Sequence, residues 1–364
     1  MQVLETGVGP VRGEYVPATP DRVLWGRLPC ATDAPVLSVD PGTEVTFDTI
    51  SHEGILEDQG RDPDRFFAPY DVPVLGDARA LAASDHPRTF GVDGPHVVSR
   101  PVAVRGARPG DLLSVTVVEA LPRVPYGVVS NRHGKGALPG EFPREGELWS
   151  AFARLDDDQR HATIAMQPGD PADGPAARFP VAPFPGILGV AVAGDRRPHS
   201  VPPGVHGGNL DIRLLTAGAT LHLPVQVDGA GFYTGDPHFA QGDGEVALTA
   251  LEASLRLTVR LDVVPAEEAV ARFGEVVSPL AETTDLLVPT GLDEDLDLAM
   301  AACVRHAVAL LEARYGMHPA QALAYLSAAT DFDVSQVVDV VKGVHARIRK
   351  SDFRGVDGPD ARST

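Results

Sequence analysis

Two short segments bounded by glycines hold many of the side chains in this chain that could act as acids, bases or metal ligands. They span residues 207–211 and 235–245, and a strand-like stretch at 219–225 separates them. Glycine lets a backbone turn sharply and approach a ligand, while carboxylate and imidazole groups supply proton transfer or metal coordination. Their succession therefore predicts a functional site.

The second segment places an acid and an imidazole two residues apart. In an extended chain residues i and i+2 project to the same side, so Asp236 and His238 can reach one point. Together with Asp211 and Glu245 they form an oxygen-plus-nitrogen set suited to a divalent ion, with zinc first and calcium or another metal as alternatives. Without a metal, the same groups would still offer a general base and a general acid.

A plainer interpretation stands beside this one. Aspartates next to glycine often cap turns, which would explain Asp211, Asp236 and Asp243 but would not require His238 or Glu245. Asn209 could orient a substrate amide through its own amide group or simply bond the backbone of a turn. Glu252 lies on the polar side of a predicted strand, where a solvated side chain is expected.

Two further candidates lie earlier in the chain. His52 and Glu53 follow a predicted strand end, where functional loops commonly gather, and His96 is a third candidate. We expect His52 and Glu53 to approach Asp236 and His238. In that case His52 would be an additional ligand or a proton carrier, and Glu53 and His96 would contact the substrate.

Composition limits the classes of function. The 364 residues carry a formal charge of -19, which argues against binding the phosphates of nucleic acids. The two cysteines, Cys30 and Cys303, lack CxxC spacing, and the nucleotide-binding glycine motifs are missing. We see neither a secretory signal nor a stretch able to span a bilayer, so a cytoplasmic protein is expected.

The periodicities favour a mainly β fold with α+β additions. Proline-glycine turns predict hairpins over 36–48 and 101–119, and residues 251–263 alternate apolar and polar as in a strand buried on one face. Helical spacing starts at Leu296 and stops at Gly316, a second helix is expected from Pro319, and a third over 333–344. We expect a β-rich body at 1–265 that carries the site, and a helical C-terminal portion with a loose tail at 266–364.

The chain resembles the acetamidase/formamidase family nearly end to end. The resemblance lies in residues 39–45, 105–111 and 183–190, is most specific at 207–211, 223–225, 235–245 and Glu252, and continues through 290–296 and 324–327. It implies a β-sandwich-like body and a homo-oligomer, dimeric or higher, that hydrolyses small aliphatic amides such as formamide or acetamide to ammonia and the acid. It also implies a divalent metal in this pocket.

The chain departs from the family pattern at two places. Residues 51–59 replace an asparagine- or glycine-glutamine motif, and Arg100 stands where a glycine precedes the proline. From the residues together with this resemblance we predict a metal-assisted amidase in which Glu245, Asp236 and His52 are catalytic and Asp236, His238, Asp211 and Glu245 bind the metal. A non-catalytic small-ligand-binding protein that retains the pocket, and a structural β-sandwich in a larger assembly, are the alternatives.

Overall fold

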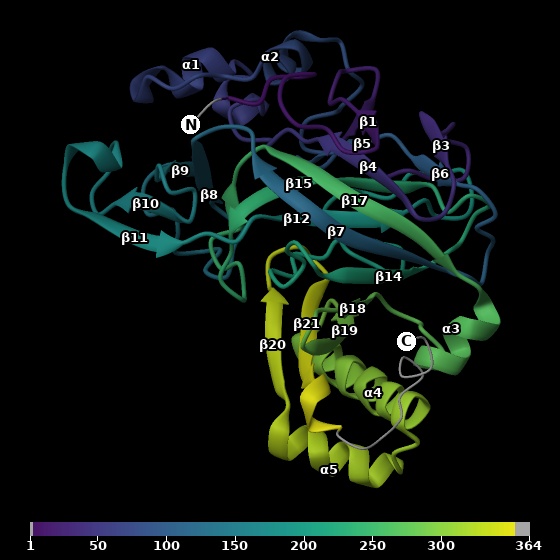
Figure 1. Cartoon of the computed structure of the whole chain (residues 1–364). Helices are drawn as coiled ribbons and strands as arrows, with labels where there is room; N and C mark the ends of the chain where they lie inside the picture. Colours follow the sequence, from purple (N-terminus) through teal and green to yellow (C-terminus); the bar gives the residue numbers. More distant parts are fainter. Residues whose placement is uncertain (1–2, 354–364) are drawn as a thin grey trace.

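The computed structural model describes residues 3–353 and is built around two β-sheets, so the mainly β fold class is confirmed (Figure 1). The first sheet has nine strands in the order β1 (Glu14–Val16), β4 (Thr43–Asp48), β17 (Leu255–Val264), β7 (Leu112–Pro122), β14 (Thr220–Pro224), β18 (Leu280–Glu282), β19 (Leu286–Asp293), β21 (Lys342–Arg349) and β20 (Asp331–Gln336).

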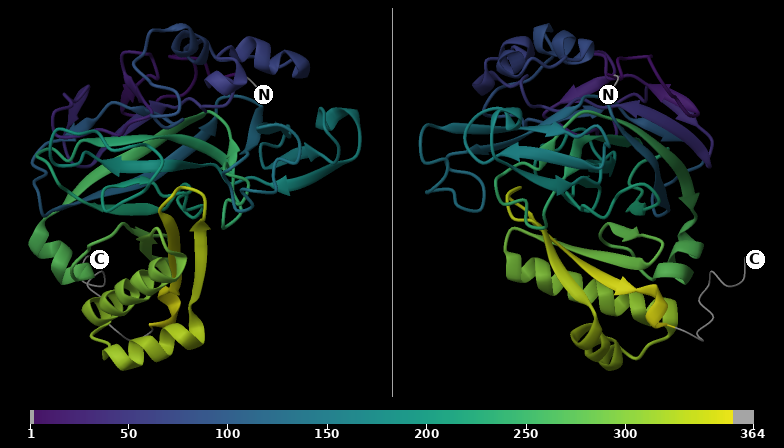
Figure 2. Two further views of the ribbon diagram at one scale, coloured as in Figure 1. Left: turned by 180° about the vertical axis from the view of Figure 1, so that it is seen from behind. Right: turned by 60° about the vertical axis from the view of Figure 1, so that its left-hand side comes forward.

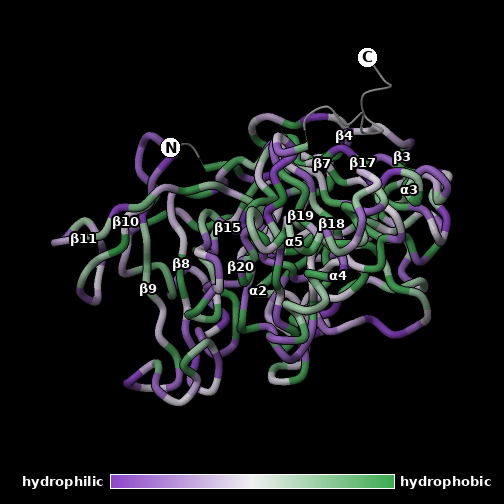
Figure 3. The backbone as a smooth tube through the Cα atoms, turned by 90° about the horizontal axis from the view of Figure 1, so that it is seen from below, coloured by the Kyte–Doolittle hydropathy of each residue, from purple (hydrophilic) through white to green (hydrophobic). Residues whose placement is uncertain are grey.

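The second sheet carries the candidate site. Its main path runs β11 (Ala176–Pro180), β10 (His161–Ala165), β9 (Leu148–Leu155), β8 (Tyr126–Arg132), β16 (Leu251–Glu252), β15 (Phe232–Ala240), β12 (Phe184–Val190) and β13 (Gly207–Asn209). The short strands β5 (Val97–Ser99) and β6 (Val102–Val104) also pair with β15, and they in turn pair with β2 (Val23–Trp25) and β3 (Leu37–Val39). Strands β10 and β11 extend from one side of the molecule (Figure 3).

The main core fills the space between the two sheets. Val115 and Leu257 of the first sheet and Leu188 and Phe232 of the second belong to one buried cluster, and the rings of Phe47 and Phe232 meet edge to face at 5.6 Å. Each such side chain contributes about 1.5–3 kcal/mol when it leaves water. This burial holds β15, at the centre of the site, against the opposite sheet.

Helices lie at the periphery (Figures 1 and 2). Near the N-terminal end are α1 (Pro63–Phe67) and α2 (Gly76–Ala83), and the C-terminal region holds α3 (Ala266–Phe273), α4 (Leu296–Tyr315) and α5 (Pro319–Ala329). Short 3₁₀ turns lie at η1 (Glu57–Gln59), η2 (Ala68–Tyr70), η3 (Pro171–Asp173) and η4 (Lys350–Asp352). No helix of the described residues is both long and apolar enough to cross a membrane.

The first two predicted C-terminal helices are confirmed. Asp295 caps α4 by accepting hydrogen bonds from the backbone amides of Asp297 and Leu298, and Gly316 ends the helix in the left-handed conformation with φ 63°. The fully buried Cys303 faces β19, as expected of an inert thiol in an apolar face.

The third predicted helix is wrong. Residues 331–336 and 342–349 form the antiparallel strands β20 and β21, with the connecting loop at 337–341. The edge of β19 supplies a hydrogen-bonding partner for β21, and this pairing is not visible in the local pattern of 333–344. The tail was predicted to be loose after Lys350, but Lys350–Asp352 forms the 3₁₀ turn η4, and the rest of the tail, residues 354–364, lies outside the described residues.

The two predicted hairpins are also wrong, although the turns exist. Strand β3 pairs with β6 in the second sheet, whereas β4 pairs with β1 and β17 in the first. Likewise β6 and β7 belong to different sheets. Each turn therefore carries the chain between the two layers of the sandwich.

The strand predicted over 251–263 is interrupted at residues 253–254, where β16 ends and β17 begins. Its polar side does not face water throughout. Arg256 and Thr258 are buried, and Arg256 donates two hydrogen bonds to Asp48, Nε to Oδ1 at 2.7 Å and Nη2 to Oδ2 at 2.9 Å. The division of the chain at residue 265 stays a prediction, and the pairing of β14 with β18 continues the first sheet across it.

Candidate active site

Strand β15 and its neighbour β16 form the centre of the site. Asp236 and His238 project to the same side of β15, as predicted, with His238 Nε2 3.2 Å from Asp236 Oδ2. Glu252 stands opposite His238 in the antiparallel register, and its Oε1 lies 3.0 Å from the same Nε2. The interpretation of Glu252 as a solvated residue is wrong, because it is 2% exposed and belongs to this cluster.

Two turns bring further carboxylates to His238. Asp211 follows β13, and its Oδ1 lies 3.9 Å from His238 Nδ1. Glu245 follows β15, and Asp211, His238 and Glu245 offer ligand atoms within 4.8 Å of one another. Asp211, Asp236 and Glu245 have positive φ values of 49°, 50° and 46°, a conformation that non-glycine residues rarely adopt. The fold thus holds all three carboxylates in strained backbone positions.

His52 does approach the cluster, so this prediction is confirmed. Its Nδ1 lies 3.6 Å from Asp236 Oδ1, and its Nε2 lies 3.3 Å from Glu53 Oε1. His96 precedes β5, with its Nε2 3.9 Å from Asp236 Oδ1. Ser130 Oγ donates to Glu53 Oε2 at 2.6 Å, which fixes that carboxylate beside the imidazole.

One residue of the site was missed by the sequence analysis. Asp339 lies in the loop between β20 and β21, whose tip reaches the body beneath β12 and β15 (Figures 1 and 2). The backbone amide of Gly244 donates to the carbonyl of Ser335 at 3.1 Å, and that of Val337 to the carbonyl of Gly244 at 3.2 Å. This contact brings the buried Asp339 into electrostatic interaction with Asp211 and Glu245.

The cluster is buried and rich in negative charge. Six carboxylates and three imidazoles are each no more than 7% exposed: Glu53, Asp211, Asp236, Glu245, Glu252 and Asp339, with His52, His96 and His238. Many of their polar atoms have no hydrogen-bond partner among residues 3–353, including both oxygens of Asp211 and both ring nitrogens of His238. His238 Nε2 is near two carboxylates but is not aligned for a hydrogen bond to either. Such a set of unpaired buried acceptors calls for a cation.

This environment shifts the pKa values of the carboxylates in different directions. Burial and the charges of Glu245 and Asp339 raise the pKa of Asp211 well above its usual range, and burial and Asp339 do the same to the pKa of Glu245. Burial and Asp236 raise the pKa of Asp339 to about 7. Burial also opposes ionisation of Asp236, but His96 and His238 outweigh it and lower its pKa. Asp236 is therefore the anionic centre of the cluster.

The pKa values of the imidazoles also differ from one another. Burial tends to lower the pKa of His52, but the adjacent Asp236 and Glu53 raise it to about 10. Burial lowers the pKa of His96 to about 4, despite the attraction of Asp236. At neutral pH His52 thus carries a proton that it can donate, whereas His96 is a neutral imidazole whose lone pair can bind a metal.

Gly186 on β12 leaves room at the middle of the cluster. It lies opposite Asp236, between the pairs Pro185↔Pro237 and Ile187↔Gly235. A Cβ at this position would lie 2.5 Å from Asp211 Oδ1, 2.6 Å from His238 Cε1 and 2.8 Å from Asp236 Oδ2. The donor set and this space fit a divalent ion, and Asp236 belongs to two of the three possible ligand groups, one with His52 and His96 and one with His238 and Glu252.

Two other residues of the glycine-bounded segments can be placed. Asn209 is buried in β13, and its Oδ1 has no hydrogen-bond partner in the described part of the chain, so it is free to accept one from a ligand. Asp243 instead accepts a hydrogen bond from Arg213 Nε at 2.8 Å, which favours a structural role.

Comparisons with known proteins agree on one family. The model of the acetamidase/formamidase family matches residues 80–198 and 191–348. A formamidase of Methylophilus methylotrophus is 26% identical over 329 residues, covering 72% of this chain and 80% of the relative. An acetamidase of Mycolicibacterium smegmatis is 27% identical over 234 residues, covering 51% of this chain and 57% of that relative. The crystal structure of an acetamidase from Bacillus halodurans has the same fold, with a TM-score of 0.72 at 23% identity, covering 94% of this chain and 99% of that one.

Proposed function

This chain belongs to the acetamidase/formamidase family, and we propose that it hydrolyses small aliphatic amides to a carboxylic acid and ammonia with the assistance of a divalent metal ion. It acts on carbon–nitrogen bonds other than peptide bonds. The observation that carries the proposal is the convergence around Gly186 of buried carboxylates and imidazoles, many of whose oxygen and ring nitrogen atoms have no hydrogen-bond partner among the described residues.

The metal would be held by Asp236, His238, Asp211 and Glu245. His96 and Glu252 lie close enough to complete the coordination of one or two ions, whereas the protonated His52 is left free to donate its proton. Nitrogen and oxygen donors together favour zinc, while the surplus of carboxylates suits calcium or another oxygen-seeking ion. A bound divalent ion polarises a carbonyl and lowers the pKa of water.

The side chains of the site can carry out the proton transfers. A bound cation would offset the effects of burial and of repulsion between carboxylates, which raise the pKa of Glu245, and would keep this residue ionised. In that form Glu245 can accept a proton as the water oxygen bonds to the amide carbon, which is general-base catalysis. When the carbon–nitrogen bond breaks, its electron pair moves to nitrogen, which takes a proton from His52. Glu53 and Asp236 flank the His52 ring and hold it in place.

Asn209 is suited to recognising the amide group. Its NH₂ can donate to the substrate carbonyl, and its unpaired Oδ1 can accept from the substrate N–H. His96 and Glu53 would line the same space. These roles discriminate an amide from an ester of the same size, because an ester leaves Oδ1 without a donor.

A small cavity lies beside two carboxylates of the cluster. It has a volume of about 20 Å³ and lies against Glu53 and Glu252, with apolar walls that include Phe67 and Tyr126. This volume holds about one water molecule.

Ammonia release from formamide, acetamide and longer amides would test the proposal. We expect activity with the short amides, loss of activity after dialysis against a chelator, and recovery on adding back the ion identified by elemental analysis. Full activity of protein shown to be metal-free would refute the role of the metal. Saturable amide binding without ammonia release would favour the alternative of a non-catalytic ligand-binding protein.

We further propose a cytoplasmic homo-oligomer, a dimer or higher. The family resemblance supports the oligomer, and the high negative charge of -19 supports a protein that stays dispersed in an aqueous compartment. Sedimentation of the purified protein would give the number of subunits.

A further inference from the structure

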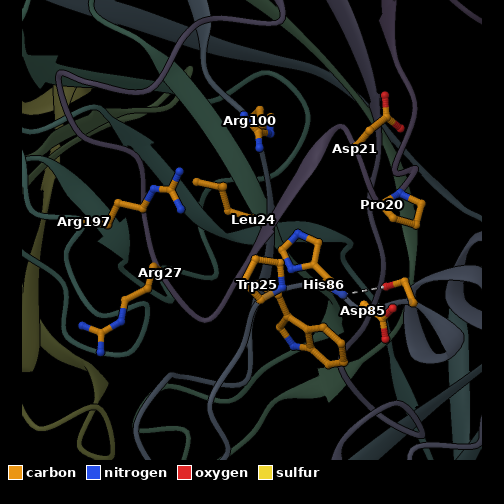
Figure 4. A pocket seen from close by; sticks show the side chains of 11 residues that line it. Pro20, Asp21, Leu24, Trp25, Arg27, Asp85, His86, Arg100 and Arg197 are labelled. Atoms are coloured by element: carbon orange, nitrogen blue, oxygen red, sulfur yellow. Dashed lines mark hydrogen bonds between the residues drawn. The ribbon is translucent and has the colours of Figure 1, made fainter.

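A surface pocket of about 370 Å³ lies beside strand β2, and the residues of the buried cluster do not line it (Figure 4). Leu24 and Trp25 of β2 and the nearby Pro20 and Pro87 provide carbon atoms to its walls. Its size is within the range of small-molecule sites. Strand β2 is hydrogen-bonded to β5, so the pocket stands on the outer side of the segment that follows His96.

Three arginines line this pocket, and two of them already have partners. Arg27 Nε donates to Asp93 Oδ1 at 2.6 Å. Arg197 Nε donates to Asp33 at 3.0 Å. Their positive charges are therefore largely neutralised within the protein.

Arg100 differs from both. Its guanidinium makes no hydrogen bond or ion pair with the described residues, and its Nε is buried without a partner. A half-buried guanidinium that lacks an acceptor has lost part of its hydration without compensation. In this otherwise acidic chain, an unpaired arginine at a pocket wall is best explained by an anionic ligand.

The chemistry of the pocket indicates which anion. A guanidinium is planar and presents two parallel N–H donors, which matches a carboxylate. Asp21 and Asp85 also line the pocket and would repel a multiply charged group such as a phosphate. We propose that the pocket binds a small monocarboxylate, with its charged end on Arg100 and its apolar tail against Leu24 and Pro20.

Fluorescence can measure this binding, because the chain has two tryptophans, Trp25 at the pocket and the exposed Trp149. In the background of Trp149→Phe, Trp25 becomes the sole tryptophan, and excitation at a wavelength that the six tyrosines do not absorb reports on it alone. Phenylacetate is the probe, and 2-phenylethanol and inorganic phosphate are the comparison ligands. We expect a saturable change with phenylacetate that the neutral alcohol does not reproduce at the same concentration.

Variants assign the binding to Arg100. Arg100→Gln should raise the Kd for phenylacetate at least about tenfold, as expected for the loss of a charged hydrogen-bonded pair. Arg100→Lys keeps the positive charge but loses the two parallel N–H donors of the guanidinium, so its Kd should be intermediate. Arg105→Gln is the matched control, because Arg105 is exposed and pairs with Asp40 outside the pocket.

Three results would overturn the proposal. They are the absence of saturable binding by the Trp149→Phe protein, equal Kd values with and without the Arg100 charge, and binding of phosphate in preference to phenylacetate. Thermal unfolding of each variant checks that the protein is folded. The assay needs no turnover, so its outcome is independent of the amidase activity proposed above.

Discussion

Adding one methyl group at Gly186 should damage the active site more than the fold. The added Cβ would fall short of ordinary van der Waals contact, which begins at 3.4 Å, by 0.9 Å to Asp211 Oδ1 and by 0.6 Å to Asp236 Oδ2. His238 Cε1 would lie at a similar short distance from the added Cβ. All three are predicted metal ligands, so they must separate or the strand must shift.

The effects on rate and stability can be estimated separately. A displacement of reacting groups by about 1 Å typically costs about 10²-fold in rate, so kcat/KM for a short amide should fall by about this factor in Gly186→Ala. Overpacking a core costs about 1–3 kcal/mol. The better strand preference of alanine returns about 0.5–1 kcal/mol of the free energy of unfolding. Stability should therefore change modestly.

A matched variant separates the two effects. Gly189 lies on the same strand, and a Cβ there would meet Tyr233 Oη at 2.3 Å, but it would touch none of the predicted ligands. We expect Gly189→Ala to lose stability while its folded fraction keeps its activity and metal content. Ammonia release, elemental analysis and urea denaturation would be measured for both variants. Wild-type kcat/KM in Gly186→Ala would refute the reasoning.

Three further predictions follow from the same structure. Glu245→Gln should lower kcat by about 10² to 10⁴-fold with little change in the midpoint of thermal unfolding, whereas intact kcat would exclude Glu245 as the base. Arg256→Gln should lower the free energy of unfolding in urea by about 3–5 kcal/mol, because Asp48 stays buried without its bidentate partner. Burial lowers the pKa of His206 to about 4, below that of an unfolded histidine, so its contribution to stability is present above about pH 6.5 and is lost as pH falls toward 4. Between pH 8 and pH 5 the free energy of unfolding in urea should fall by about 2 kcal/mol more in the wild-type protein than in His206→Gln, and an equal fall in the two proteins would contradict the assignment.

Local sequence patterns predicted the structure correctly where residues within one segment determine it. The helix from Leu296 to Gly316 was predictable because its N-terminal cap, its apolar spacing and the glycine that ends it all lie within one segment. Asp236 and His238 were predictable as a pair because the period of a strand fixes which side they face. His52 was identified by its position after a strand, and only the fold could give its 3.6 Å distance to Asp236.

Local sequence patterns gave the wrong structure where pairing with a distant segment determines the conformation. Asp339 lies in a stretch that was interpreted as helix, and its strands form because β19 offers an edge to β21. The alternation of the buried Val344, Ala346 and Ile348 was a usable strand signal. Glu252 was assigned to a solvated face because one-sided burial was assumed, whereas β16 is covered on both sides at the point where it meets β15.

Some glycines beside the site serve the purpose inferred from their spacing, since Gly207, Gly208 and Gly244 have positive φ values of 83°, 83° and 102°. We interpreted them as turn residues that let the carboxylates approach a ligand, yet the carboxylates themselves take up much of the unfavourable backbone conformation. Asp211, Asp236 and Glu245 are left-handed, at a cost of about 1–2 kcal/mol each.

Gly235 instead allows two strands to come together, since a Cβ there would lie 2.2 Å from the carbonyl oxygen of Val97. That close approach brings His96 beside Asp236. The left-handed backbone of the three acidic residues and the close approach of the strands at Gly235 therefore act together. The backbone conformation directs the carboxylates toward one point, and the close approach places the His96 imidazole next to them.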